Sequence, residues 1–296
     1  MTKVPEKLKA GDTVGIVAPS GRFDRDKFYR GVEIIESMGL RVTFPKGIFD
    51  ACGYLSAPDD IRAAHLEAAF ADPDVKAVLC ARGGYGAVRV LTRLDFEKMR
   101  SSPKWFVGFS DITALLAAIY GKCGFAVLHG PMAATLTDMD ETSITLFQKA
   151  LMDPEKYRLP LDNCRIIQPG KAFGKVCGGN LTTLCHLIGT EYQPRFANHI
   201  LFLEDTGEAA YRIDRMMHHL LLSGCLRGIR GVVLGTFHGC GDYGRVVDIM
   251  CEVLEGSGIP IVADFPAGHG SANVAIPMGT PAVLDTEAGS IAFGEE

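Results

Sequence analysis

The chain has 296 residues, of which 47% are hydrophobic and 22% are charged, and its formal net charge is −5. This length exceeds the usual size of one compact domain, so we expect two domains. The acidic balance offers no basic surface for nucleic acid. No apolar run approaches the ~20 residues that cross a bilayer, and the N-terminus lacks the apolar core of a secretory signal. These features indicate a globular protein without nucleic-acid or membrane partners.

Cysteine and histidine are scattered along the chain. None of the nine cysteines forms a C-x-x-C pair, which is typical of buried thiols in a reducing compartment. We therefore expect the protein to be cytoplasmic. The eight histidines show no zinc-binding spacing, so the sequence indicates neither a metal nor another cofactor.

Short apolar runs alternate with helix-length stretches in the first half of the chain. Residues 24–39 and 58–73 have the pattern of amphipathic helices. The apolar runs lie at residues 13–20, 41–45, 75–81, 105–110 and 126–130. Near-continuous apolar strands joined by helices are typical of a parallel sheet covered on both faces. We predict a doubly wound α/β domain over residues 1–155.

The second half of the chain has a different pattern. The proline-containing stretch of residues 156–174 shows little periodicity and is predicted to be a linker. A second domain over residues 175–296 should mix strands and helices less regularly. Its helical patterns lie at residues 209–224 and 245–258, and residues 275–293 alternate like a β-hairpin.

Candidate site residues should lie just after the apolar runs, because open α/β sheets bind ligands outside the carboxyl ends of their strands. Such places are APSG (18–21), ARGGYG (81–86), GFSD (108–111) and HGPM (129–132). The glycines of ARGGYG permit close approach of the backbone to a ligand. A phosphate-binding loop is not indicated, because the G-x-x-x-x-G-K-[ST] pattern is absent.

Ser110 of GFSD has two interpretations. The motif matches the first half of a nucleophile elbow, in which a sharp turn from strand to helix exposes a serine. A serine ahead of an apolar helix is also a common helix cap, and this motif alone favours the cap. A nucleophilic serine further requires a base and a group that orients the base.

The base and the orienting acid must come from elsewhere in the chain. His269 lies between two glycines after an apolar run, while His129 ends another run and is the alternative base. Glu204 closes an apolar strand, where a carboxylate is costly unless it is paired. Asp205 and Glu208 have D-x-x-E spacing before a helix, which reads as a variant of the capping box.

Taken together, these segments resemble the LD-carboxypeptidase family of serine peptidases, which cleave murein tetrapeptides and include the microcin C self-immunity peptidases. The matching motifs run in the family's order over nearly the whole chain: GDTVGIVAPSG, ARGGYGAVRVL, FVGFSDITALL, HGPM, GGNLTTL, LFLEDTGEAAYRIDR and GHGSANVAIPMG. The resemblance implies an N-terminal flavodoxin-like domain and a smaller C-terminal β-rich swivelling domain, with the site at their junction. Many members of the family are dimers, so a homodimer is one expectation.

The family's catalytic triad corresponds to Ser110, Glu204 and His269, which changes the preferred role of the serine from cap to nucleophile. The family pattern also implies an oxyanion hole formed by the backbone N–H groups of Asp111 and Gly84. The substrate implied is a murein tetrapeptide in cell-wall recycling, cleaved between L-Lys or meso-diaminopimelate and the C-terminal D-Ala.

Arg82 and Tyr85 are candidate substrate-binding residues, and Arg82 could bind the free carboxylate of the substrate. A structural ion pair is the alternative role of this arginine. Hydrolysis of a peptidyl-nucleotide remains a rival function, but the one tryptophan, Trp105, starts a core strand. Non-enzymatic ligand binding is a rival of another class. A cysteine hydrolase is disfavoured, because Cys80 ends a core strand.

Overall fold

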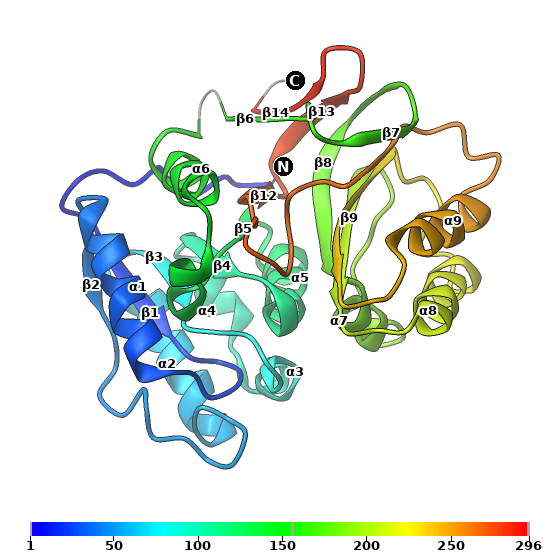
Figure 1. Cartoon of the computed structure of the whole chain (residues 1–296). Helices are drawn as coiled ribbons and strands as arrows, with labels where there is room; N and C mark the ends of the chain where they lie inside the picture. Colours follow the sequence, from blue (N-terminus) through cyan, green and yellow to red (C-terminus); the bar gives the residue numbers. More distant parts are fainter. Residues whose placement is uncertain (1, 155–156, 295–296) are drawn as a thin grey trace.

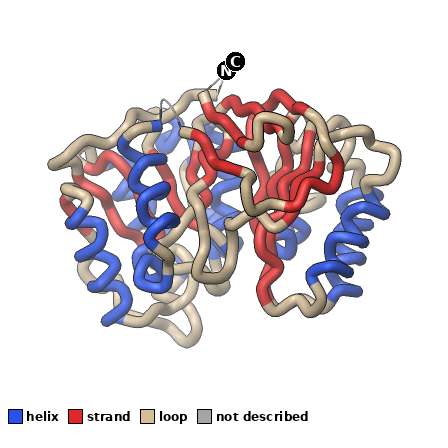
Figure 2. Tube along the Cα trace, turned by 45° about the horizontal axis from the view of Figure 1, so that its top comes forward, coloured by secondary structure: helices blue, strands red, loops and turns tan. Residues whose placement is uncertain are grey.

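The computed structural model describes residues 2–154 and 157–294. Within these residues the chain forms a six-stranded sheet, called here the first sheet, and an eight-stranded second sheet. Figure 1 shows the sheets in neighbouring halves of the molecule, with helix α5 (Thr113–Cys123) between them. In the tube view of Figure 2, helices flank the strands of both halves.

The first sheet has the strand order β12-β5-β4-β3-β1-β2, in which β12 comprises Ile276–Met278 and β1 to β5 are parallel. The order 2-1-3-4-5 is that of flavodoxin-like folds, so the predicted fold is confirmed. The strands are β1 (Thr13–Val17), β2 (Arg41–Thr43), β3 (Val75–Cys80), β4 (Trp105–Gly108) and β5 (Val127–His129). The other helices of this half are α1 (Arg25–Ser37), α2 (Asp59–Ala71), α3 (Ala87–Val90), α4 (Phe96–Arg100) and α6 (Glu141–Met152), with 3₁₀ turns η1 (Leu91–Arg93), η2 (Ser110–Ile112) and η3 (Ala133–Asp138).

Local sequence accounts for these elements. All residues of β4 are buried, as expected for a parallel strand whose two faces are both covered. Helix α1 begins after Asp24, whose side chain accepts a hydrogen bond from the backbone N–H of Lys27, a common helix N-cap. Its buried residues Phe28 and Val32 lie one turn apart and face the core.

The second sheet has a parallel centre, β8-β9-β10-β11, with antiparallel strands on both sides. Its strands are β6 (Arg158–Pro160), β7 (Arg165–Gln168), β8 (Lys171–Asn180), β9 (His199–Thr206), β10 (Gly231–His238), β11 (Ile261–Ala263), β13 (Pro281–Asp285) and β14 (Ser290–Phe293). Its helices are α7 (Leu181–Leu187), α8 (Ala210–Leu222) and α9 (Tyr243–Val253). The helices expected at residues 209–224 and 245–258 are present, and β13 and β14 form the expected antiparallel pair.

The division into domains differs from the prediction in two places. Residues 157–174, expected to be part of a linker, contain β6, β7 and the start of β8, all in the second sheet. Because β6 and β7 are edge strands with exposed residues, they lack an apolar run that sequence reading could detect. The predicted boundary at residues 155–156 lies outside the described residues.

The C-terminal part of the chain also returns to the first half. Strand β12 (Ile276–Met278) pairs antiparallel with β5 in the first sheet, with Ile276 opposite His129. The loop that carries His269 therefore leaves β11 in one sheet and enters β12 in the other. This crossing fixes the loop at the junction between the two halves.

Candidate active site

Ser110 lies at the end of β4, where the chain turns sharply into η2. Its φ of 62° is one of few positive values among the non-glycine residues of the described chain. Such a conformation costs of order 1–3 kcal/mol and persists where the surrounding structure enforces it. Ser110 is not the N-cap of η2 or of α5, and neither helix start has a side-chain cap. The capping interpretation of Ser110 is therefore wrong, and the turn has the strained geometry of a nucleophile elbow.

The structure brings Ser110, His269 and Glu204 into one hydrogen-bonded chain. The Oγ of Ser110 lies 3.1 Å from His269 Nε2, and His269 Nδ1 lies 2.7 Å from Glu204 Oε2. A carboxylate only accepts hydrogen bonds, so Nδ1–H donates to Glu204 and Nε2 is left to accept the serine hydroxyl. This arrangement is that of nucleophile, base and orienting acid.

The electrostatic environment suits His269 as a base. Burial disfavours the charged imidazolium, but the hydrogen bond and the charge of Glu204 outweigh burial, so the pKa of His269 is raised above its usual value of 6.5. Glu204 is fully buried on β9. A buried carboxylate was expected to have a partner, and the partner of Glu204 is His269.

Gly268 allows the loop of His269 to approach Glu204. A Cβ at this position would lie 2.8 Å from Glu204 Oε2 and 2.6 Å from Thr236 Oγ1, and the φ of Gly268 is +122°. Thr236 donates a hydrogen bond of 2.8 Å to the carbonyl of His269. Asn273 accepts one of 2.9 Å from the N–H of Gly268. Sequence reading noticed the glycines but missed Thr236 and Asn273, because neither side chain belongs to a recognisable local motif.

His129, the alternative base, is close to the site but is enclosed in the core. It is fully buried, and its ring lies 5.8 Å from that of Phe109 and 4.8 Å from that of Phe202. Burial, reinforced by the charge of His269, lowers the pKa of His129 to about 3. His129 is thus a neutral core residue, and the hydrogen bonds of the described residues include none between it and Ser110.

The carboxylate of Asp111 holds three loops together. Its Oδ2 accepts hydrogen bonds from Ser20 Oγ, after β1, and from the N–H of Ala87, at the start of α3. Burial raises the pKa of this carboxyl, against the lowering effect of these hydrogen bonds. Sequence reading considered only the backbone N–H of Asp111 and missed this role of its side chain.

The RGGYG turn lies directly against Ser110. A Cβ on Gly83 would lie 3.1 Å from Ser110 Cβ, so the backbone approaches the serine as closely as a glycine permits. Gly84 has a φ of +111° and lines the same cleft as Ser110 and Asp111. Both oxyanion candidates therefore border the cleft beside Ser110, and their role as donors stays a prediction.

The expected capping box at Asp205 and Glu208 is wrong. Helix α8 begins only at Ala210 and has no side-chain cap. Asp205 instead ends β9 and accepts hydrogen bonds from Asn180 Nδ2 and from the hydroxyl and N–H of Thr182. These bonds join the ends of two neighbouring strands, so tertiary contacts rather than helix capping satisfy this carboxylate.

The cleft beside Ser110 has a volume of about 480 Å³ and lies between the two halves of the molecule. From the first half it is lined by Ser110 and Tyr85, and from the second half by Asn180, Thr182 and Glu208. Arg82, expected to bind substrate or form an ion pair, donates to the carbonyl of Arg22 at 2.7 Å, and no carboxylate of the described residues forms an ion pair with it.

Two other kinds of site were weighed from the sequence. Cys80 is fully buried, and burial together with the charge of Asp111 raises the pKa of its thiol well above the usual value, so it is not an activated nucleophile. In the described part of the chain, no group of three or more His, Cys, Asp or Glu residues could hold a metal ion. The helices of residues 2–154 and 157–294 include none with the length and apolar character needed to cross a membrane.

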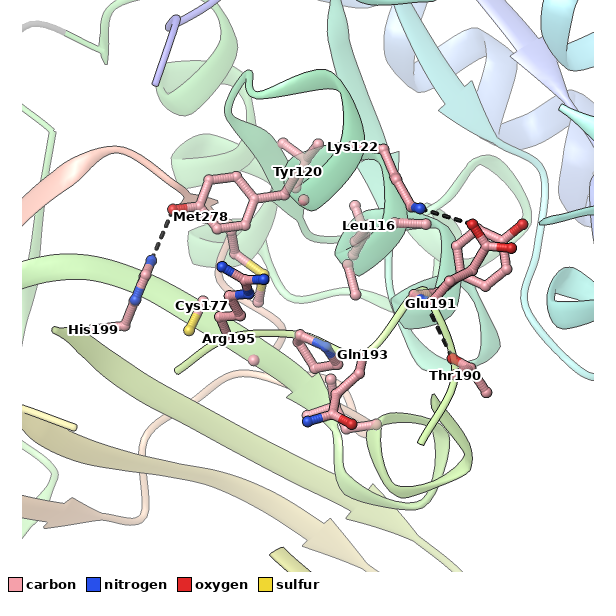
Figure 3. Close-up of a pocket in the computed structure, with 18 of the residues that line it drawn as sticks. Leu116, Tyr120, Lys122, Cys177, Thr190, Glu191, Gln193, Arg195, His199 and Met278 are labelled. Atoms are coloured by element: carbon pink, nitrogen blue, oxygen red, sulfur yellow. Dashed lines mark hydrogen bonds and ion pairs between the residues drawn. The ribbon is translucent and has the colours of Figure 1, made fainter. Parts of the chain in front are cut away.

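A second hollow between the two halves, of about 750 Å³, lies between α5 and the strands β8 and β9. Figure 3 shows some of its polar side chains paired with one another. Tyr120 Oη lies 2.7 Å from His199 Nε2, and Lys122 Nζ lies 2.8 Å from Glu191 Oε2. Ser110 does not line this hollow.

Comparison with known proteins places the chain in a family. Residues 14–130 match the LD-carboxypeptidase N-terminal domain, and residues 173–284 match the LD-carboxypeptidase C-terminal domain. The chain thus belongs to the LD-carboxypeptidase family. Membership makes it a serine peptidase with a carboxypeptidase role.

Relatives and solved structures agree with this assignment. A Bacillus subtilis protein named "Probable murein peptide carboxypeptidase" is 37% identical, over 95% of this chain and 91% of its own length. The murein tetrapeptide carboxypeptidase of Pseudomonas aeruginosa is 30% identical, with 92% of each chain covered. A crystal structure of an MccF-like protein from Bacillus anthracis superposes with a TM-score of 0.90, at 28% identity and with 98% of each chain covered. The muramoyltetrapeptide carboxypeptidase of Oxalobacter formigenes superposes with a TM-score of 0.83, at 31% identity and with 95% of this chain and 97% of its own covered.

Proposed function

We propose that the protein is a serine LD-carboxypeptidase that removes the C-terminal D-Ala of murein tetrapeptides, after L-Lys or meso-diaminopimelate, in cell-wall recycling. The observation that carries this proposal is the chain from Ser110 through His269 to Glu204 at the edge of the interdomain cleft. Relatives named for murein peptides support the substrate class.

In the proposed mechanism, Ser110 Oγ attacks the carbonyl carbon of the scissile amide while its proton moves to His269 Nε2. Glu204 orients the imidazole and stabilises the imidazolium. The backbone N–H groups of Asp111 and Gly84 donate to the oxyanion of the tetrahedral intermediate. Losing one donor of this kind typically costs about 3 kcal/mol, so the backbone of both turns contributes to the rate.

The intermediate collapses when His269 passes its proton to the amide nitrogen of D-Ala, which leaves as a free amino acid. The rest of the peptide is then held as an ester of Ser110. Water attacks this ester, with His269 again accepting a proton, and the serine hydroxyl is restored. The strained turn that carries Ser110 exposes its Oγ for both steps.

A peptidyl-nucleotide substrate is the closest alternative, because the fold superposes well on an MccF-like protein. Stacking of a base favours an aromatic surface in the site. Trp105, the only tryptophan of the chain, is fully buried in β4. Trp105 therefore cannot stack a base, and the relatives named for murein peptides favour the muropeptide as the substrate.

The test is to incubate the purified protein with a murein tetrapeptide and measure the release of D-Ala, beside the Ser110→Ala variant. We expect turnover by the wild type and a loss of roughly 10⁴-fold or more in the variant. An inactive wild type would contradict the proposed substrate. Full activity in the variant would contradict the role of Ser110, and tetrapeptide binding without any turnover would favour the non-enzymatic alternative.

A further inference from the structure

A third hollow, smaller than the other two, adjoins the cleft of Ser110 at the RGGYG turn. It has a volume of about 370 Å³ and is lined by Gly21, Arg22, Tyr54, Arg82, Gly84 and Tyr85. We call it the arginine hollow. Gly84 and Tyr85 line both the arginine hollow and the cleft, so these two residues form the border that the two hollows share.

The fold places the arginine hollow where α/β sheets bind ligands. Arg22 follows β1 and Arg82 follows β3, and these two parallel strands are neighbours in the first sheet. The next strands in sequence, β2 and β4, lie on opposite sides of this pair. The hollow is therefore at the topological switch point, outside the carboxyl ends of the strands, which is the usual ligand position in such folds.

In the described part of the chain, no carboxylate forms an ion pair with the two arginines of the arginine hollow. Arg82 Nη1 donates to the backbone carbonyl of Arg22, which orients the side chain without neutralising it. The ion pairs of the described residues, for example that of Arg89 with Asp59, include none with Arg22 or Arg82. Two exposed guanidinium groups thus border one hollow without a carboxylate partner.

The cleft of Ser110 has the opposite charge. Among its described lining residues, Asp111, Asp205 and Glu208 are acidic, and none is a lysine or an arginine. A carboxypeptidase must nevertheless hold a substrate that carries carboxylates next to the scissile bond and further along the peptide. Arg82 connects the arginine hollow to the site of Ser110 through the backbone, because Gly83, which follows Arg82, packs against Ser110.

We propose that the arginine hollow is a subsite that binds a carboxylate of the peptide substrate through Arg22 and Arg82. Guanidinium groups form paired hydrogen bonds with carboxylates, which fix both position and direction. The exposed rings of Tyr54 and Tyr85, with centroids 5.7 Å apart, form an amphipathic wall for the adjoining peptide. This inference rests on the proposed function and adds to it the groups that hold the substrate's acid.

Two carboxylates of a murein tetrapeptide fit this chemistry: the C-terminal one of D-Ala and the free α-carboxylate of the glutamyl residue. Three substrates distinguish them, namely the free acid, the C-terminal carboxamide and the glutamyl α-carboxamide. Each is assayed for kcat and KM with the wild type and with Arg22→Gln and Arg82→Gln. The control is Arg195→Gln, which changes an exposed arginine lining the hollow of Figure 3.

With the free acid we expect both variants to lose roughly 10- to 100-fold in kcat/KM, mainly through KM, as for a lost charged hydrogen bond. The control should behave like the wild type. Amidation of the carboxylate bound in the arginine hollow should weaken the wild type by a similar factor and the variants no further. For one of the two carboxamides, the loss caused by amidation and the loss caused by the arginine substitution should not be additive. The carboxylate that this carboxamide replaces is then the one bound in the arginine hollow.

A single loss factor shared by all three substrates, or no loss at all, would overturn the proposal. To keep this test separate from the proposed function, binding of the tetrapeptide is also measured by calorimetry on the Ser110→Ala background. There, Arg82→Gln should raise Kd for the free acid by roughly 10- to 100-fold, whether or not the wild type releases D-Ala. An unchanged Kd would refute the subsite even in an active enzyme.

Discussion

The cleft beside Ser110 and the larger hollow of Figure 3 both lie between the two halves of the molecule, and α5 lines only the larger one. The larger one, about 750 Å³ against about 480 Å³, contains polar side chains that pair with one another, such as Tyr120 with His199. The smaller one is lined by a strained serine, which is aligned with an imidazole and a buried carboxylate behind it. Convergence of groups with complementary roles, rather than volume, thus distinguishes a candidate catalytic site from a structural void.

The largest difference between the two regions is expected when one carboxylate is removed from the hydrogen-bonded groups beside each hollow. Glu204→Gln keeps the size of the side chain but no longer stabilises the correct tautomer and charge of His269, so we expect kcat to fall roughly 10⁴-fold. Glu191→Gln, which breaks the ion pair with Lys122, should change kcat by less than about twofold. Equal effects of the two substitutions on kcat for D-Ala release would refute the triad.

A methyl group added to the loop of His269 tests how tightly the site is packed. In Gly268→Ala, the new Cβ would meet Glu204 and Thr236, and displacing the imidazole by about 1 Å should lower kcat roughly 10²-fold. Gly270→Ala is the matched control: its φ of +139° is equally strained, but nothing lies within 4 Å of the added Cβ. Comparable kcat losses in the two variants would show that backbone strain alone, not the contact with Glu204, matters.

The pH dependence of activity should report His269 rather than His129. Only neutral His269 can accept the proton of Ser110, so kcat/KM should fall about tenfold for each pH unit below the raised pKa of His269. His129, with a pKa of about 3, stays neutral throughout this range. In Glu204→Gln, the acid limb of the remaining activity should move to lower pH, because the stabilising charge is gone. An acid limb at unchanged pH in Glu204→Gln would contradict the proposed effect of Glu204 on the pKa of His269.

The smallest effect is expected in the larger hollow. Tyr120→Phe removes the hydroxyl that contacts His199, which should lower the free energy of unfolding by about 1 kcal/mol and leave kcat and KM for the tetrapeptide unchanged. Chemical denaturation and the D-Ala assay measure the two effects. A large loss of activity at equal stability would mean that this hollow takes part in catalysis.

Local patterns in the sequence were sufficient for many elements of the fold. Apolar runs and amphipathic periods predicted β1 to β5, α1 and α2, because buried parallel strands and amphipathic helices leave strong patterns. The same reasoning failed where the pattern was weak or ambiguous. The edge strands β6 and β7 were read as a linker, and Asp205 was read as a cap although it ends a strand.

By itself, the sequence determined many of the elements, the flavodoxin-like half and, through ordered family motifs, which serine, glutamate and histidine to examine. Only the tertiary structure decided that Ser110 is strained and not a cap, that His269 rather than His129 meets it, and that Arg22 and Arg82 share one hollow. The physical reason is distance along the chain: Ser110 and His269 are 159 residues apart in sequence, and His269 and Glu204 are 65 apart. Contacts of that kind exist only once two sheets and the crossing strand β12 have packed together.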